Sequence, residues 1–298
     1  MRSGIRWCLR ACFLLAVVLA TAGVQRNIPC TNCAKWNTAQ APFRIFGNTY
    51  YVGTHGLTSV LVTSPGGHIL IDGDLPESAP LIANNIRSLG FRLQDVKVIV
   101  NSHVHFDHAG GIAELQRRTG ARVVASEWSA RVLRHGGVAK DDPQFGTIRP
   151  IAPVKNVSTF RDGEVIQVGE VAITPHLTPG HTAGGTSWTW KSCEGAVCHD
   201  MVYADSLNPV SAAGFRFSRD YPNVVEAFEK SFSFFETVPC DVLITAHPDA
   251  SDLWERLAQR EKGVNPDPMV NPGSCRELAA SAREKWRQRV SQEKPGNR

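Results

Sequence analysis

The chain has 298 residues, of which 42% are hydrophobic and 20% are charged. These proportions are ordinary for a folded globular protein, and the length allows one large α/β domain or two smaller ones. No compositional break favours two domains. The formal net charge of +4 falls to about +1 once the three arginines of the first ten residues are set aside, and no Lys/Arg cluster remains. Nucleic acid is therefore not expected as a partner.

The first 22 residues are typical of a secretory signal peptide, with three arginines ahead of an apolar run that begins near Ala11 and ends in small residues. The run of about 12 apolar residues is too short to span a bilayer, which needs roughly 20. We therefore predict cleavage after Ala22, a periplasmic protein without a membrane anchor, and a single domain over residues 23–298.

Six cysteines follow this leader, and by position they form three pairs. An even count in an exported protein favours disulfides over zinc thiolates, because the compartment is oxidising. Six cysteines allow 15 connectivities, so the pairing by position is a prediction only. The CTNC segment could instead be a redox or metal motif, although no second CxxC completes a four-sulfur site. The predicted pairs are Cys30 with Cys33, Cys193 with Cys198, and Cys240 with Cys275.

Residues 42–73 alternate β-branched and aromatic residues with turn signals, which predicts a run of antiparallel strands. A helix is expected over 78–91, ended by Gly90, and a short buried strand over 96–101. A loop and a second helix, over 111–120, follow that strand. Junctions of this kind are where α/β folds carry their chemistry.

A second passage with the same rhythm begins near residue 169. The predicted elements are a strand pair over 169–187, a short strand over 201–207, a helix over 224–238 and a strand over 240–248. Residues 274–294 predict a charged amphipathic helix that packs along the domain. Cys275 at the start of this helix would join it to the strand near Cys240.

The segment HVHFDHAGG, residues 103–111, places three histidines and an aspartate within six positions. His103 and His105 are two apart, so an extended backbone points both the same way. Asp107 and His108 then turn onto a nearby position. Imidazole and carboxylate groups suit Zn²⁺, and the pattern indicates two half-sites for metal ions.

A catalytic site for two zinc ions needs more than four ligands, which predicts further histidines at strand ends downstream. His181 lies in the glycine-rich LTPGHTAGGTSW, and His247 follows a predicted buried strand in LITAHP. The other five histidines are interpreted as structural, with two alternatives left open: His55 could line a cleft and His176 could support a ligand. The five are His55, His68, His135, His176 and His199.

HVHFDHAGG resembles the HxHxDH signature of the metallo-β-lactamase superfamily, and the later GH and AHP segments fall where that family keeps its other ligands. The similarity extends from about Phe43 to the final helix. It implies an αββα sandwich, which is an α/β fold of two mixed sheets flanked by helices. Lactamases, glyoxalase II, lactonases and tRNA-processing nucleases share the signature, so it constrains the fold and metals better than the substrate.

Finer features resemble class B β-lactamases of the third subclass, B3. LTPGHTAGGTSWTW is similar to that subclass, and YADSL has no cysteine at the place where the first two subclasses carry a cysteine ligand. The resemblance implies two Zn²⁺ per chain. The implied ligands are His103, His105 and His181 for the first zinc, and Asp107, His108 and His247 for the second.

The same resemblance implies substrate contacts. Ser206 is expected to face the site and to hold the substrate carboxylate, with Asp205 structural, although glyoxalase-type relatives use the equivalent aspartate to bridge the metals. Asn208 stands where relatives often have a second serine, and its amide can still donate hydrogen bonds. Gln144 falls in an expected loop over the cleft. Asp72 and Asp74, at the end of a predicted strand, are expected to support the metal loop by accepting hydrogen bonds, Asp72 from a ligating histidine; the alternative is an ordinary turn acid.

The implied activity is opening of the β-lactam ring by a zinc-bound hydroxide, with Asp107 holding the second metal and orienting the hydroxide. No GxSxG segment offers a nucleophilic serine. A lactonase or thioester hydrolase of the same fold is the first alternative, and a non-catalytic exported zinc-binding protein is a remote one. We expect a monomer whose partners are small-molecule β-lactams.

Overall fold

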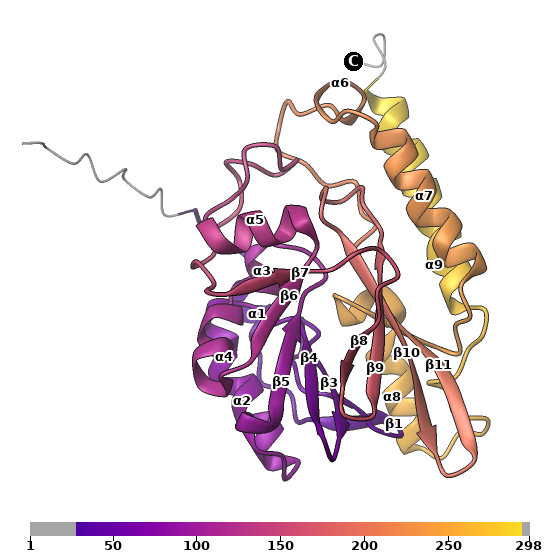
Figure 1. The fold of residues 1–298 in the computed structure, drawn as a ribbon. Coiled ribbons are helices and arrows are strands. Elements are labelled where there is room, and N and C mark those ends of the chain that lie inside the picture. Colours follow the sequence, from indigo (N-terminus) through magenta and orange to yellow (C-terminus); the bar gives the residue numbers. More distant parts are fainter. Residues whose placement is uncertain (1–27, 294–298) are drawn as a thin grey trace, which may run out of the picture.

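The computed structural model describes residues 28–293, and the predicted signal peptide lies outside the described residues. Two β-sheets pack face to face between two layers of helices (Figure 1). This is the predicted αββα sandwich, and both sheets mix parallel and antiparallel pairs as expected. Within the described part of the chain, no helix is long and apolar enough to cross a membrane.

The first sheet has seven strands in chain order, and its first four strands pair antiparallel as the alternation over 42–73 predicted. The pairs β4–β5, β5–β6 and β6–β7 are parallel. Its strands are β1 (Phe43–Phe46), β2 (Thr49–Tyr51), β3 (Val60–Ser64), β4 (Gly67–Ile71), β5 (Val96–Val100), β6 (Arg122–Ala125) and β7 (Val157–Thr159).

The second sheet has five strands in the order β12-β11-β10-β9-β8, and only its β11–β12 pair is parallel. The long hairpin β10–β11 extends the strand predicted over 201–207 back to Val197. Its strands are β8 (Ile166–Val168), β9 (Val171–Leu177), β10 (Thr186–Glu194), β11 (Val197–Ala204) and β12 (Val242–Thr245).

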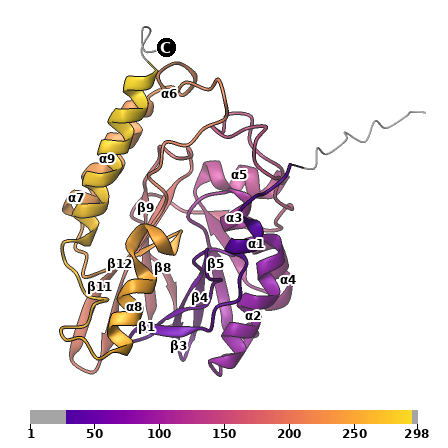
Figure 2. The same cartoon turned by 180° about the vertical axis from the view of Figure 1, so that it is seen from behind.

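Helices cover the outer face of each sheet, with α2 and α4 on the first sheet and α7 and α9 on the second (Figures 1 and 2). The helices are α1 (Cys33–Trp36), α2 (Ala79–Ser88), α3 (Phe106–Ala109), α4 (Ile112–Thr119), α5 (Glu127–His135), α6 (Phe217–Asp220), α7 (Val224–Thr237), α8 (Leu253–Glu261) and α9 (Ser274–Gln292). Three short 3₁₀ turns, η1 (Pro76–Ser78), η2 (Leu93–Asp95) and η3 (Pro248–Ser251), complete the described elements.

The buried apolar side chains form three layers: one between the two sheets and one between each sheet and the helices on its outer face. In β5, Val98 and Val100 lie in the core between the sheets, whereas Ile99 lies in the core beneath α2 and α4. Strands of this kind carry apolar residues on both faces, and VKVIV was interpreted as such a buried strand, with the exposed Lys97 as its polar residue. The third layer packs α7 and α9 on the second sheet, with Phe228 and Trp286 stacked in it.

All three predicted disulfides are present. The pair Cys240–Cys275 joins the segment before β12 to the start of α9, as proposed from the sequence. The pair Cys30–Cys33 is a disulfide, so the metal-binding interpretation of CTNC was wrong, whereas a redox role is not tested.

Candidate metal centre

The candidate ligands gather at one end of the sandwich, where strands of both sheets end. His103, His105 and α3 follow β5, and His247 follows β12. His181 lies in the loop between β9 and β10. The loop after β5 is held to the second sheet, since the backbone N–H of Thr186 donates to the carbonyl of Ser102 at 2.8 Å. Parallel strands that end at a common edge thus bring residues distant in sequence together.

Five of the six predicted ligands are buried, at 1–7% relative exposure. Buried polar groups are costly unless hydrogen bonds or metal ions satisfy them. Two sets each offer ligand atoms that lie within 4.8 Å of one another. The sets are His103 with His105 and His181, and His103 with Asp107 and His108.

In the first set, each imidazole has one nitrogen that is hydrogen-bonded to another residue of the protein, which we call the outer nitrogen. The other, inner nitrogen faces the rest of the set. His103 Nδ1 lies 2.6 Å from Asp205 Oδ1, and His105 Nε2 lies 2.9 Å from Asp142 Oδ2. The third histidine, His181, donates from Nδ1 to a backbone carbonyl, that of Asn208, at 2.7 Å. Three acceptors therefore fix the orientation of three rings.

The inner nitrogens of the same rings converge. His105 Nδ1 and His181 Nε2 are 3.2 Å apart, and His103 Nε2 is buried without a hydrogen-bond partner. Because an imidazole that donates from one nitrogen keeps its lone pair on the other, these three atoms are the ones free to bind a cation. The donor set suits a metal ion with nitrogen ligands, such as Zn²⁺.

A second cluster, formed by Asp107, His108 and His247, is centred on the carboxylate of Asp107. Its Oδ2 lies 3.5 Å from the Nε2 atoms of both His108 and His247. The outer nitrogen of His247 is 3.3 Å from the carbonyl of Gly56, and Nδ1 of His108 is buried without a partner. The structure thus brings all six predicted ligands together, in two adjoining clusters.

The electrostatics of the six groups are mixed. Burial lowers the pKa of His105 and His247, but the carboxylates of Asp142 and Asp107 outweigh it and raise the pKa of both imidazoles in the metal-free protein. Burial lowers the pKa of His103 and His108 well below the ordinary value, so both imidazoles are neutral at pH 7. Burial raises the pKa of Asp107, but the imidazoles of His108 and His247 outweigh it and hold that pKa well below its usual range. Asp107 is therefore ionised.

The predicted substrate residues line one cavity of about 470 Å³ together with the ligands. Ser206 and Asn208 lie on its wall, whereas Asp205 lies outside it, behind His103. Ser206 thus faces the metal cavity and Asp205 holds the ring of His103, while their roles toward substrate stay predictions. Gln144 also reaches the cavity, and its Nε2 lies 3.4 Å from His105 Nδ1.

Asp72 supports the ligand loop as expected, but it makes no hydrogen bond to a ligating histidine. Its carboxylate accepts hydrogen bonds from the backbone and side chain of Ser102, each at 2.6 Å, and from the Tyr203 hydroxyl at 2.7 Å. The nearest ligand nitrogen, His108 Nδ1, is 3.7 Å away. Asp72 directly follows β4, beside the loop backbone at Ser102. It therefore fixes the start of the ligand loop.

The two alternatives left open for other histidines, that His55 lines the cleft and that His176 supports a ligand, were wrong. His55 stacks on Trp254 and contacts Gln40, and His176 contacts Thr189. Among the residues that the structure describes, the histidines lining the metal cavity are the five predicted ligands alone.

Sequence reasoning missed two features of the site. The first is Asp142, whose only signal was its place two residues before Gln144 in DDPQ. The second is the disulfide-closed segment at the N-terminus, in which residues 29–32 and Trp36 line the cavity. The ring of Trp36 lies 5.3 Å from that of His247. Nothing local in the sequence links this segment to the ligands.

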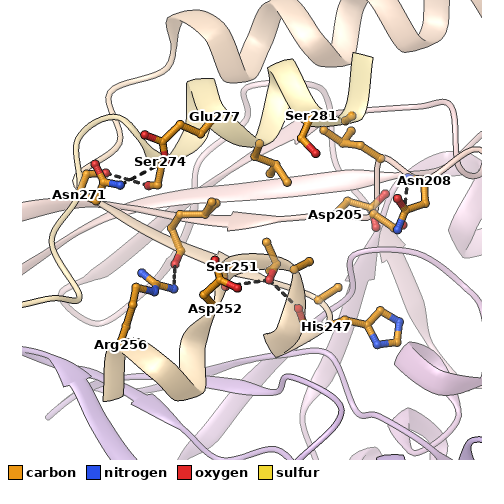
Figure 3. A pocket seen from close by; sticks show the side chains of 18 of the residues that line it. Asp205, Asn208, His247, Ser251, Asp252, Arg256, Asn271, Ser274, Glu277 and Ser281 are labelled. Atoms are coloured by element: carbon orange, nitrogen blue, oxygen red, sulfur yellow. Dashed lines mark hydrogen bonds between the residues drawn. The ribbon is translucent and has the colours of Figure 1, made fainter. Parts of the chain in front are cut away.

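A second cavity of about 500 Å³ lies between α8 and α9 (Figure 3). Asp205, Asn208 and His247 lie at one end of it, and Asn271 and Ser274 at the other. Ser206, Asn208 and His247 also line the metal cavity. The loop after β11 is thus a wall common to both cavities.

Comparison with known proteins agrees with this geometry. The family model described as "Metallo-beta-lactamase superfamily" matches residues 52–247. The chain is similar to the solved structure of Rm3 metallo-beta-lactamase, at 56% identity over 89% of this chain and 99% of that one, with a TM-score of 0.86. It is similar to MEM-A1, a subclass B3 metallo-beta-lactamase from a soil metagenome library, at 50% identity over 87% and 98%, with a TM-score of 0.83.

A more distant likeness is to hydroxyacylglutathione hydrolases. The protein of that name from Bradyrhizobium sp. (strain ORS 278) is 26% identical over 61% of this chain. The match spans 58% of that relative, which is less than two thirds of its length.

Proposed function

The chain belongs to the metallo-beta-lactamase superfamily, and we propose that it is a B3 β-lactamase that binds two zinc ions and hydrolyses the β-lactam ring. The observation that carries the proposal is the convergence of three inner imidazole nitrogens beside the Asp107 cluster in one cavity. The relatives of 50–56% identity bear the name metallo-beta-lactamase. The hydroxyacylglutathione hydrolases are less similar and are matched over a shorter part.

We assign the first zinc to His103, His105 and His181, and the second to Asp107, His108 and His247. Nitrogen and carboxylate donors fit zinc, and the six described cysteines are engaged in disulfides. When bound, the two ions would supply a Lewis acid for the carbonyl oxygen and a water whose pKa falls toward about 7.

The chain's own residues would position the reactants. The ionised carboxylate of Asp107 accepts a hydrogen bond from the attacking water and orients it. Ser206 and Asn208 donate from a hydroxyl and an amide to the substrate carboxylate, since both line the cavity. Gln144 also lines the cavity, and its amide nitrogen lies 3.4 Å from His105 Nδ1.

The place of Asp205 favours a lactamase over a glyoxalase-type thioester hydrolase. A bridging aspartate has to reach both metal sites, whereas Asp205 holds the outer nitrogen of His103 from outside the cavity. Metallo-beta-lactamase SMB-1 was solved with 2-mercaptoethanesulfonate bound, and it is 46% identical over 87% of this chain and 99% of that one, with a TM-score of 0.84. A similar protein therefore binds a small anionic ligand.

The test uses the processed protein. We expect two zinc ions per chain and opening of a carbapenem ring that a chelator abolishes and added zinc restores. Asp107→Ala and His181→Ala should remove turnover, whereas His176→Ala, a matched change at a histidine outside the cavity, should keep it. Two bound zincs with turnover of a glutathione thioester and of no β-lactam would refute the proposal.

We also propose that residues 1–22 are removed on export to the periplasm and that the processed protein is a monomer. The three disulfides support an oxidising compartment. N-terminal sequencing of a periplasmic fraction should begin at Gly23, and light scattering should give the mass of one chain. Retention of the protein in the cytoplasmic fraction would contradict the first claim.

A further inference from the structure

The buried carboxylate of Asp142 is divided between two partners. One oxygen, Oδ2, lies 2.9 Å from His105 Nε2, and the other, Oδ1, accepts the backbone N–H of Gln144 at 2.8 Å. Asp142 is only 3% exposed, so water does not compete for these bonds. A single side chain therefore touches both a candidate ligand and the loop that carries a candidate substrate contact.

That loop depends on Asp142 for its shape. The backbone N–H of Asp142 donates to the carbonyl of Ala139 at 3.2 Å, and the N–H of Phe145 donates to the carbonyl of Asp142 at 3.0 Å. A further hydrogen bond joins the loop to the segment after β11, since the N–H of Ala212 donates to the carbonyl of Pro143 at 2.8 Å. We call residues 139–147 the rim loop.

The other two ligands of the first cluster take their outer hydrogen bonds from another segment. His103 is held by Asp205 and His181 by the carbonyl of Asn208, both in the segment after β11, which meets the rim loop only through the Ala212–Pro143 backbone bond among the hydrogen bonds of the described residues. Only His105 takes its outer hydrogen bond from the rim loop. A change in the Asp142 side chain would therefore act on the first cluster most directly through one ring.

We propose that Asp142 is a positioning residue that couples the rim loop to the metal-facing nitrogen of His105. While Nε2 donates to Asp142, the lone pair of the ring is on Nδ1, which faces His181 Nε2 at 3.2 Å and the Gln144 amide at 3.4 Å. Substrate contact with the rim loop and metal binding at His105 are then linked, and the coupling is reciprocal. This inference rests on the proposed role of His105 as a zinc ligand.

Asp142→Asn tests the coupling because an amide has one oxygen for two donors. If that oxygen faces Gln144, the amide nitrogen donates to His105 Nε2, moves the ring proton to Nδ1 and blocks the inner nitrogen. If it faces His105, the amide nitrogen meets the Gln144 N–H and the rim loop loosens. We expect a roughly 10- to 100-fold loss of zinc affinity in the first case and a raised KM with retained affinity in the second.

Three measurements distinguish these outcomes. Nitrogen-15 NMR of the metal-free protein reports the His105 tautomer, competition with a chromophoric chelator gives the affinity for zinc, and kinetics give KM and kcat. Asp142→Glu, which retains a carboxylate, should restore the tautomer and most of the affinity but not KM. Asp141→Asn is the matched control, because the exposed Asp141 bonds Trp128 and Arg131 instead.

The proposal is overturned if folded Asp142→Asn keeps the wild-type tautomer, zinc affinity and KM. It is also overturned if Asp141→Asn reproduces the effects of Asp142→Asn. The tautomer and affinity measurements need no β-lactam. If the wild-type protein binds zinc but opens no β-lactam, the proposed function fails while the coupling is still decided.

Discussion

Replacement of Gly185 by alanine should weaken zinc binding without touching a ligand. A Cβ at this position would lie 2.4 Å from Asp205 Oδ2 and 2.6 Å from the carbonyl oxygen of Thr178. The backbone cannot retreat easily, because the N–H of Thr178 donates to the carbonyl of Gly185 at 2.9 Å. Asp205 must therefore rotate and the Thr178 carbonyl must shift, which disturbs the 2.6 Å contact between Asp205 and His103 Nδ1.

Two costs follow from that rotation. Overpacking of a tight site costs about 1–3 kcal/mol of stability. Loss of the group that orients a ligating histidine lowers metal affinity by roughly 10- to 100-fold, which corresponds to about 1.4–2.7 kcal/mol. Urea unfolding of the metal-free protein measures the first cost, and competition with a chelator measures the second.

Gly195→Ala is the matched control for Gly185→Ala. Gly195 lies in the β10–β11 turn with a φ of +60°, and a Cβ there meets nothing within 4 Å. This control should lose about 1 kcal/mol of stability through backbone strain and keep its zinc affinity. Equal zinc affinities for Gly185→Ala and the wild type would refute the reasoning.

Three further predictions concern the surroundings of the site. Replacing Cys240 and Cys275 by serine should lower the free energy of unfolding by about 4 kcal/mol, because this disulfide closes a loop with a sequence separation of 35. Replacing the hairpin pair Cys193 and Cys198, with a separation of 5, should lower it by about 2 kcal/mol. Urea unfolding that reverses this order would contradict the prediction. Burial raises the pKa of Glu293, but N–H groups of α6 outweigh it and lower that pKa below 4.5, so stability should be lost as pH falls below about 4.5. Glu293→Gln should flatten this loss in urea titrations at pH 6 and 3.5, and an unchanged loss would count against it. Trp36→Ala, which removes the ring 5.3 Å from His247, should raise KM more than it lowers kcat, and steady-state kinetics showing the reverse would exclude a role in the cavity wall.

The fold was predictable where the sequence has a clear period. Residues 42–73 alternate and form β1–β4, and VKVIV, which is apolar except for the exposed Lys97, forms β5, whose other residues are buried. The ligand set was predictable for a related reason. His103, His105, Asp107 and His108 occupy one short segment, and the strand-end positions of His181 and His247 are visible in the sequence.

What holds the ligands was less predictable, because it depends on contacts between distant segments. Asp142 is 37 positions from His105, and Asp205 is 102 positions from His103. Of the three glycines in the segment around His181, only Gly180 has a positive φ. Gly185 is required by the space that Asp205 occupies, and no local pattern reveals such a constraint.

The supports of the two clusters differ in strength. In the first cluster every outer nitrogen has an acceptor within 2.9 Å. In the second, the outer nitrogen of His247 is 3.3 Å from its acceptor and that of His108 has none. The His247 side chain is 31% exposed, against 1% for His103. The polypeptide therefore fixes the first cluster from three sides, whereas the second lies open to the cavity in which substrate has to bind.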